Sequence, residues 1–121
     1  MSNLNRKLTI LLHIENYCEE ISDTFKFFGK NFETFESNAI FRNSISMPVF
    51  QICELSKLLD KEYHEYIDQT KNEVPWKAII RMRERFAHHY IDMDNKIIFD
   101  TALNDIPILM EFISKEIKKE Y

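Results

Sequence analysis

Glycine is nearly absent from this chain of 121 residues, which contains one glycine, Gly29, and three prolines, Pro48, Pro75 and Pro107. Tight turns between strands draw heavily on glycine and proline, so this composition argues against a sandwich or barrel of many strands. Phosphate-binding loops of the P-loop and dinucleotide-binding types need two or more closely spaced glycines, and the sequence therefore excludes both. The chain is predicted to be mostly helical.

Cysteine is also scarce, and acidic residues outnumber basic ones, 20 to 16. Cys18 and Cys53 are too few for a disulfide scaffold and match no zinc motif, so we expect both to be reduced core residues of a cytoplasmic protein. The net charge is -4, so any contact with nucleic acid would need a local basic patch. His13 and His64 have no second ligand at metal spacing, and we expect neither a metal nor a cofactor.

Long apolar runs are missing as well. The stretch from Leu8 to Leu12 is too short for a signal peptide or a membrane-spanning helix, and no membrane association is expected.

Apolar residues recur every three or four positions and predict four helical segments in one domain, residues 1–121. The segments run from about 5 to 28, from 37 or 38 to 59, from 75 to 90, and from 92 or 94 towards 120. Pro48 is expected to kink or split the second segment, and Pro107, after Asn104 and Asp105, to mark a break with a fresh N-cap. Residues 31–36 and 60–74 are predicted loops, the second with room for one short helical turn. The predicted fold class is all-α, an antiparallel bundle of four to five helices.

The segment 75–90 has the most informative pattern, because Arg83 falls in the middle of its apolar face at about 100° per residue. The residues on that face are Trp76, Ile79, Phe86, Ala87 and Tyr90, and a polar stripe roughly opposite holds Arg81, Glu84, Arg85 and His88. A charge on a core face is costly unless it is paired. One interpretation is therefore a buried ion pair, with Glu54 as the candidate partner. The other is an arginine held at a cleft or subunit seam for a phosphate, which the planar guanidinium suits.

Two histidines, His88 and His89, lie at the end of the same segment. Glu84 precedes His88 by four residues and can meet it on one face, and the negative end of the helix dipole favours a protonated imidazole. Such an imidazole suits general acid–base catalysis, although a solvated histidine is the simpler interpretation. Arg83 and His88 lie about 140° apart on a regular helix. They can converge only if the helix ends near His88 or if the site lies in a crevice such as a dimer seam.

The spacing of Arg83, four residues, His88, one residue and Tyr90 resembles the signature of HEPN-domain ribonucleases, in particular their HepT-like toxin branch. The resemblance extends over nearly the whole chain. It includes Val74-Pro75-Trp76-Lys77, Met82-Arg83, residues 86–94, Asn104-Asp105-Ile106-Pro107, and upstream Arg42-Asn43-Ser44-Ile45-Ser46 and Gln51-Ile52-Cys53-Glu54-Leu55.

This resemblance implies an all-helical, HEPN-like homodimer in which the two Arg-His motifs face each other across the seam. The implied activity is metal-independent cleavage of RNA, in which the 2′-hydroxyl attacks the adjacent phosphate and leaves a 2′,3′-cyclic phosphate. His88 would transfer protons and Arg83 would stabilise the phosphorane charge. The implied partner is a nucleotidyltransferase-type antitoxin, which in this branch can block the motif tyrosine, here Tyr90, by adenylylation.

Two positions depart from the pattern of the family. Arg81 replaces a usual glycine, and Glu84 replaces a small polar residue such as asparagine. A carboxylate at Glu84 would repel RNA phosphate or pair with Arg83 or His88, although Arg81 and Arg85 could offset it locally. His89 also stands at a permitted distance from Arg83, but the tyrosine two residues after His88 favours His88.

Two alternatives to an active ribonuclease therefore stay open. The chain could be a catalytically weak HEPN protein that serves as a dimeric binding or regulatory module for a nucleotidyltransferase. It could also be a plain dimeric helical protein in which Arg83 is only structural.

Overall fold

The computed structural model describes residues 3–89 and 94–120, and within α1 and α5 it leaves out the side chains of residues 3–5 and 87–89. The elements are α1 (Asn3–Phe28), α2 (Phe32–Ser37), α3 (Ala39–Glu62), α4 (His64–Thr70), α5 (Trp76–His89), α6 (Asn95–Asp100), the π-helix η1 (Thr101–Asp105) and α7 (Ile106–Glu120). No strand occurs in these ranges, so the predicted all-α class is confirmed.

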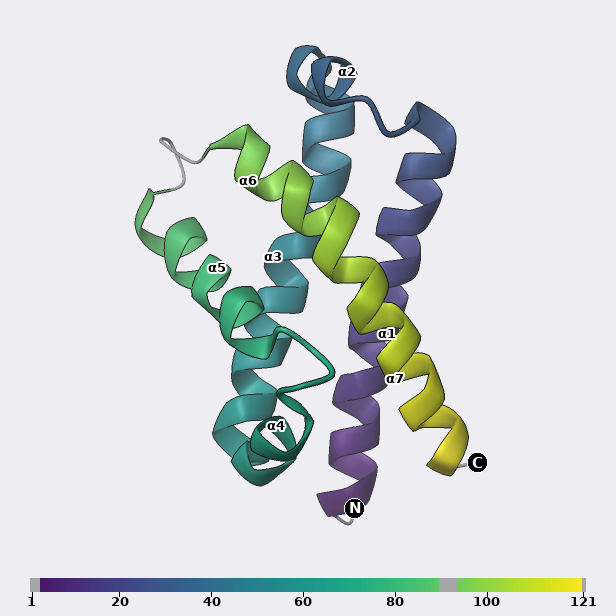
Figure 1. Ribbon diagram of the computed structural model, residues 1–121, viewed down its shortest axis with the longest axis vertical. Coiled ribbons are helices and arrows are strands. Elements are labelled where there is room, and N and C mark those ends of the chain that lie inside the picture. The colour runs from purple at the N-terminus through teal and green to yellow at the C-terminus, as the bar shows by residue number, and fades with distance from the viewer. Residues whose placement is uncertain (1–2, 90–93, 121) are drawn as a thin grey trace.

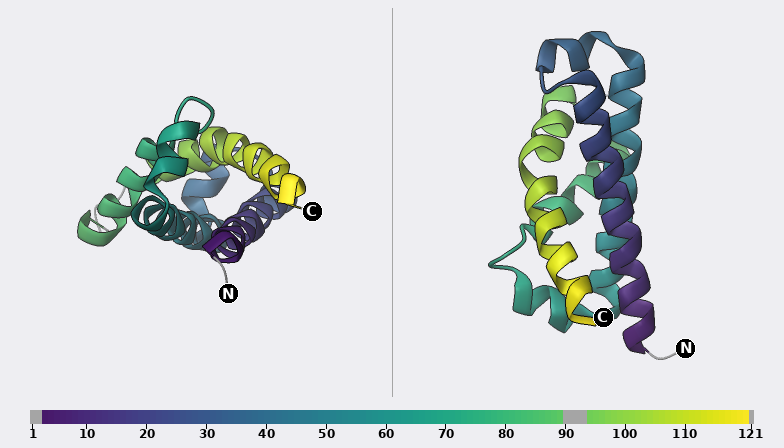
Figure 2. Two further views of the ribbon diagram at one scale, coloured as in Figure 1. Left: turned by 90° about the horizontal axis from the view of Figure 1, so that it is seen from below. Right: turned by 90° about the vertical axis from the view of Figure 1, so that its right-hand side faces the viewer.

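The long helices form an antiparallel bundle (Figure 1). Helix α1 packs against α3 and α7, and α5 packs against α3, so that α3 lies between α1 and α5. Figure 2 shows the same arrangement end-on, with α1 beside both α3 and α7. In the described part of the chain, no helix is both long and apolar enough to cross a lipid bilayer.

Short polar side chains fix where the helices begin. The Asn38 side chain accepts a hydrogen bond from the Phe41 N–H at 3.1 Å, and Asp94 accepts one from the Lys96 N–H at 2.8 Å. Such N-caps satisfy amide groups that have no partner within the helix. Gly29 follows α1 with a φ of +84°, in the left-handed region that favours glycine after a helix. The predicted stop at Gly29 and the predicted starts near residues 38 and 94 are confirmed.

The prediction of a loop at residues 31–36 was wrong, and the short helical turn allowed within residues 60–74 is present as the seven-residue helix α4. Residues 31–36 hold most of α2, and residues 60–74 hold the end of α3 and the whole of α4. Each short helix is held by a buried side chain, Phe35 in α2 and Ile67 in α4. Packing onto the bundle thus stabilises segments that are too short to show a clear helical period.

The predicted fresh N-cap before Pro107 is absent, and at Pro48 the predicted kink or split does not take the form of a split. Pro48 lies inside α3, which continues through it without a split. Before Pro107, the fresh N-cap is absent, because Ile106 has helical angles (φ −64°, ψ −40°) and its N–H donates to the Thr101 carbonyl. The chain instead passes from α6 through η1 into α7, and the π-helix takes the place of the predicted break.

Aromatic rings fill the end of the core near α2. Phe41 of α3 is fully buried and stacks on Phe28 at 4.7 Å between ring centroids. It also packs edge to face against Phe25 and Phe35, with 5.9 and 5.2 Å between the ring centroids. These contacts join α1, α2 and α3, and ring pairs of this geometry add to the stabilisation from buried area.

Trp76, at the start of α5, is buried and joined to α4 by a hydrogen bond. Its indole N–H donates to the Thr70 hydroxyl oxygen at 2.9 Å. Thr70→Val keeps the shape but leaves this buried N–H without its partner, and we expect it to lower the free energy of unfolding by about 1–3 kcal/mol. Urea denaturation measures the change. Thr24→Val is the control, because its hydroxyl bonds an exposed carbonyl of α1 and its loss should cost little.

Candidate functional site: the Arg83–Glu54 pair between α5 and α3

Arg83 reaches from α5 to α3. Its Nε donates to Glu54 Oε1 at 2.9 Å, and its Nη1 donates to Glu84 Oε1 at 3.2 Å. The hydrogen bond and the charge of Glu54, followed by those of Glu84, raise the pKa of Arg83 above its ordinary value. The guanidinium is therefore charged and oriented, and Nη2 takes part in neither contact.

The position of Arg83 differs in one respect from the prediction. Among the described side chains of α5, those that are buried are Trp76, Ile79, Met82 and Phe86, which form a stripe that passes beside Arg83. The prediction left Met82 out of the apolar face and so placed Arg83 at its centre. With 33% of the Arg83 side chain and 37% of the Glu54 side chain exposed, the pair lies at the edge of the core, within reach of solvent.

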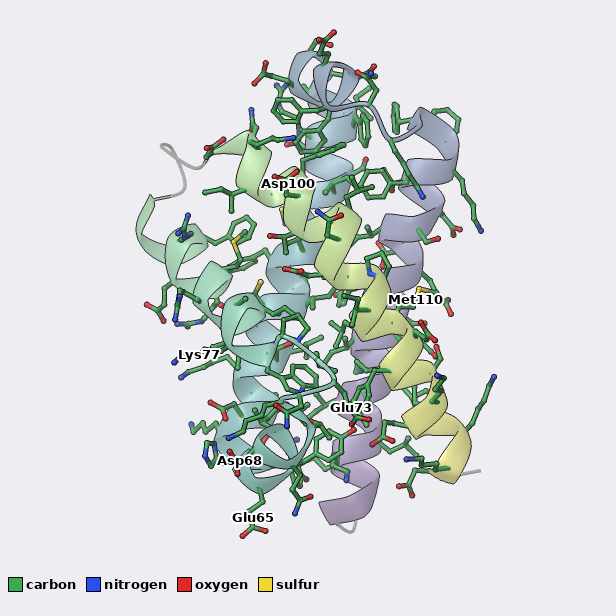
Figure 3. The ribbon with its side chains drawn as sticks, in the orientation of Figure 1. Glu65, Asp68, Glu73, Lys77, Asp100 and Met110 are labelled. Atoms are coloured by element: carbon green, nitrogen blue, oxygen red, sulfur yellow. The ribbon has the colours of Figure 1, made fainter. Side chains whose placement is uncertain are left out.

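A basic stripe runs along the outer side of α5. Lys77, Arg81 and Arg85 are spaced four residues apart, and all three are exposed. Figure 3 shows Lys77 pointing away from the bundle. Side chains at this spacing share one helix face, so α5 carries the kind of local basic patch that an acidic protein needs to contact nucleic acid. Glu84 interrupts the positive charge of this region.

His88, the residue predicted to transfer protons, belongs to the last turn of α5. The side chains of His88 and His89, and the whole of Tyr90, lie outside the described part of the structure. The backbone of α5 is described up to His89.

An exposed apolar groove borders the ion pair. Ser46, Met47, Phe50 and Phe86 line a hollow of about 230 Å³, and Met47 is 54% exposed. The rings of Phe50 and Phe86 meet edge to face at 5.2 Å. Phe50 lies one helical turn before Glu54 on α3. The groove was not predicted from the sequence, because α3 is apolar nearly all round, but the spacing of 47, 50 and 54 does place these residues on one face.

The two histidines outside α5, His13 and His64, lie on the surface. His13 is exposed, and exposed His64 contacts Asp60 through Nδ1 at 2.8 Å. Across the described residues, no three side chains of the metal-binding types come together. This region therefore offers an arginine, carboxylates and a basic stripe as its chemical groups.

Comparison with known proteins places the chain in a family. Residues 14–116 match the family model described as "Ribonuclease HepT-like". A protein of Caldanaerobacter subterraneus named "Putative RNase" is 32% identical over 110 residues, which cover 91% of this chain and 93% of that protein. One of Thermococcus cleftensis named "Probable ribonuclease HepT" is 38% identical over 37 residues, 31% of this chain and 34% of that protein. No solved structure matched. With this coverage, the chain belongs to the HepT-like ribonuclease family.

Proposed function

We propose that this protein is a HepT-like toxin that cleaves RNA without a metal ion. The observation that carries the proposal is the Arg83–Glu54 pair, which holds a guanidinium in a fixed direction at the edge of α5, where solvent can reach it. The exposed Lys77, Arg81 and Arg85 supply attraction for a polyanion beside it. Membership of a ribonuclease family supports RNA as that polyanion.

In the proposed reaction, the ribose 2′-oxygen attacks the adjacent phosphorus while its proton passes to a base. The bond from phosphorus to the 5′-oxygen then breaks, and that oxygen receives a proton. The products are a 2′,3′-cyclic phosphate and a 5′-hydroxyl. We assign the proton transfer to His88 and the stabilisation of the phosphorane oxygens to Arg83. Glu54 acts as a positioning residue, because it holds Nε of Arg83 and leaves Nη2 outside the contact.

We assign the groove of Met47, Phe50 and Phe86 to the seam of a homodimer. An exposed apolar hollow next to the ion pair is the type of surface that a second copy would cover. Such a seam would bring the two Arg-His motifs together, as a composite site requires. Sedimentation at micromolar concentration tests this assignment, and a monomer under those conditions would overturn the composite site.

A nucleotidyltransferase-type antitoxin is the proposed partner in the cytoplasm, with Tyr90 as the residue that it adenylylates. Co-expression with the nucleotidyltransferase of a neighbouring reading frame, followed by peptide mass spectrometry, tests this step. We expect one added AMP on the peptide that contains Tyr90 and none in Tyr90→Phe. An unmodified tyrosine after co-expression with that partner would contradict the assignment.

Cleavage itself is tested with purified protein and cellular RNA in excess EDTA. We expect fragments with 2′,3′-cyclic phosphate and 5′-hydroxyl ends, and we expect His88→Ala to abolish them. Because EDTA binds divalent metal ions, contaminating metal-dependent nucleases are inactive in this assay. If the wild-type protein cuts no better than His88→Ala, the enzyme hypothesis is wrong.

The contact between Glu84 and Arg83 favours a second candidate function, that of a weakly catalytic binding module for the nucleotidyltransferase. Glu84 occupies Nη1 of Arg83 and brings negative charge to the place where phosphate would bind. If the protein is an active ribonuclease, Glu84→Asn should raise kcat/KM by about fivefold, which corresponds to removing roughly 1 kcal/mol of repulsion.

Glu111→Asn is the matched control, because Glu111 is an exposed carboxylate of α7 that pairs only with Lys115 among the contacts described. It should leave kcat/KM unchanged. A wild type without cleavage in EDTA, and a Glu84→Asn variant that also fails to cut, would favour the binding module.

A further inference from the structure

A pocket of about 180 Å³ lies between α1 and the η1–α7 segment, away from the Arg83–Glu54 pair. On both walls, the one along α1 and the one along η1 and α7, the lining side chains recur every three or four residues. The lining residues are Cys18, Ile21, Ser22, Phe25, Lys26 and Lys30 on one side and Ala102, Leu103, Ile106, Pro107 and Met110 on the other. In Figure 3, Met110 marks the pocket side of the molecule and Lys77 marks α5 on the other side.

The π-helix forms part of this pocket. Ala102 and Leu103 belong to η1, and Pro107 has no N–H to donate to the preceding turn. A π-helical turn includes an extra residue, is rare in proteins and is found frequently at functional sites. The irregular turn thus coincides with the place where α7 leaves room beside α1.

The lining has an apolar floor and a positively charged rim. Cys18, Ile21 and Ile106 are buried, whereas Lys26 and Lys30 are exposed. The described lining includes both lysines and no carboxylate. The ion pair of Lys26 within the described residues is with the exposed Asp23, at the long distance of 4.0 Å. Lys30 is placed at the rim because Gly29, with its positive φ, turns the chain at the end of α1.

We propose that this pocket binds a small amphipathic anion, a carboxylate with an unbranched apolar chain, whose tail lies on the buried floor and whose carboxylate lies between Lys26 and Lys30. The size fits such a ligand, because an apolar cavity of about 150 Å³ can hold a benzene molecule. A few polar groups above an apolar floor are the usual composition of a small-molecule site. The inference does not depend on RNA cleavage.

Titration of the whole protein with butanoate, hexanoate and octanoate, followed by methyl NMR, tests the proposal. We expect saturable shifts at Ile21, Ala102 and Ile106, and an affinity that rises by about fourfold for each added methylene until the floor is covered. Ser22→Leu fills the pocket from its half-buried rim and should remove the binding while the fold is retained.

The charge is tested separately with 1-octanol, which has the same chain and no carboxylate. The double variant Lys26→Gln/Lys30→Gln should weaken octanoate binding by about tenfold and leave octanol binding unchanged. Shifts that do not saturate, shifts confined to the Phe50–Phe86 groove, or saturable octanoate binding that neither variant weakens would each overturn the proposal.

Discussion

Arg83→Ala is expected to lower the rate of RNA cleavage by about 10²–10³-fold, the usual cost of removing one group that stabilises transition-state charge. The fold should survive, because the Glu54 carboxylate left behind is already 37% exposed and can be hydrated. Single-turnover cleavage of a short RNA measures the rate, and circular dichroism during heating checks the fold.

Arg81→Ala is the matched control for this prediction. Arg81 lies on the same helix and is exposed, so its loss removes one long-range charge and should change the rate only a few-fold. Arg83→Lys keeps the charge but cannot reproduce the planar fork, and its rate should stay closer to that of Arg83→Ala than to wild type. Equal rates for Arg83→Ala and wild type would leave Arg83 with a structural role alone.

Phe41→Ala is expected to lower the free energy of unfolding by about 3–5 kcal/mol. The reason is that Phe41 is fully buried and its ring contacts Phe25, Phe28 and Phe35, which belong to α1 and α2. The cavity left by the ring cannot collapse easily when two other helices hold its walls. Chemical denaturation monitored by the fluorescence of Trp76 gives the value.

The chain provides its own control in Phe27, which is 81% exposed. Phe27→Ala removes the same number of atoms without opening a core cavity, so the free energy of unfolding should change by less than about 1 kcal/mol. A similar loss in both variants would mean that Phe41 is not the centre of this cluster.

The sequence was most informative where one residue type has one physical role. Gly29 ends α1, because glycine adopts a positive φ more easily than other residues. Asn38 and Asp94 cap α3 and α6, because their short side chains can accept a hydrogen bond from the first amide groups of a helix. The partner of Arg83 could also be anticipated, since a charge near the core needs an opposite charge on a neighbouring helix and Glu54 was available.

The features that escaped prediction depend on contacts between distant segments. Helix α2 and the full length of α4 are too short to show a period, and they are stabilised by side chains buried against the bundle, Phe35 in α2 and Ile67 and Thr70 in α4. The π-helix before Pro107 has no sequence signature apart from the proline, which equally suggests a break. The groove at Met47 could not be predicted, because apolar residues lie on nearly all faces of α3 and so do not mark one face as exposed.

The two cysteines provide a means of watching the bundle open. Cys18 and Cys53 are each about 1% exposed, and burial raises the pKa of both thiols to about 12. Since a thiol reacts as its thiolate, neither residue should react with a labelling reagent at neutral pH while α1 and α3 stay packed. The labelling rate at Cys18 would therefore report how often α1 opens, and the rate at Cys53 how often α3 opens, without any substitution in the protein.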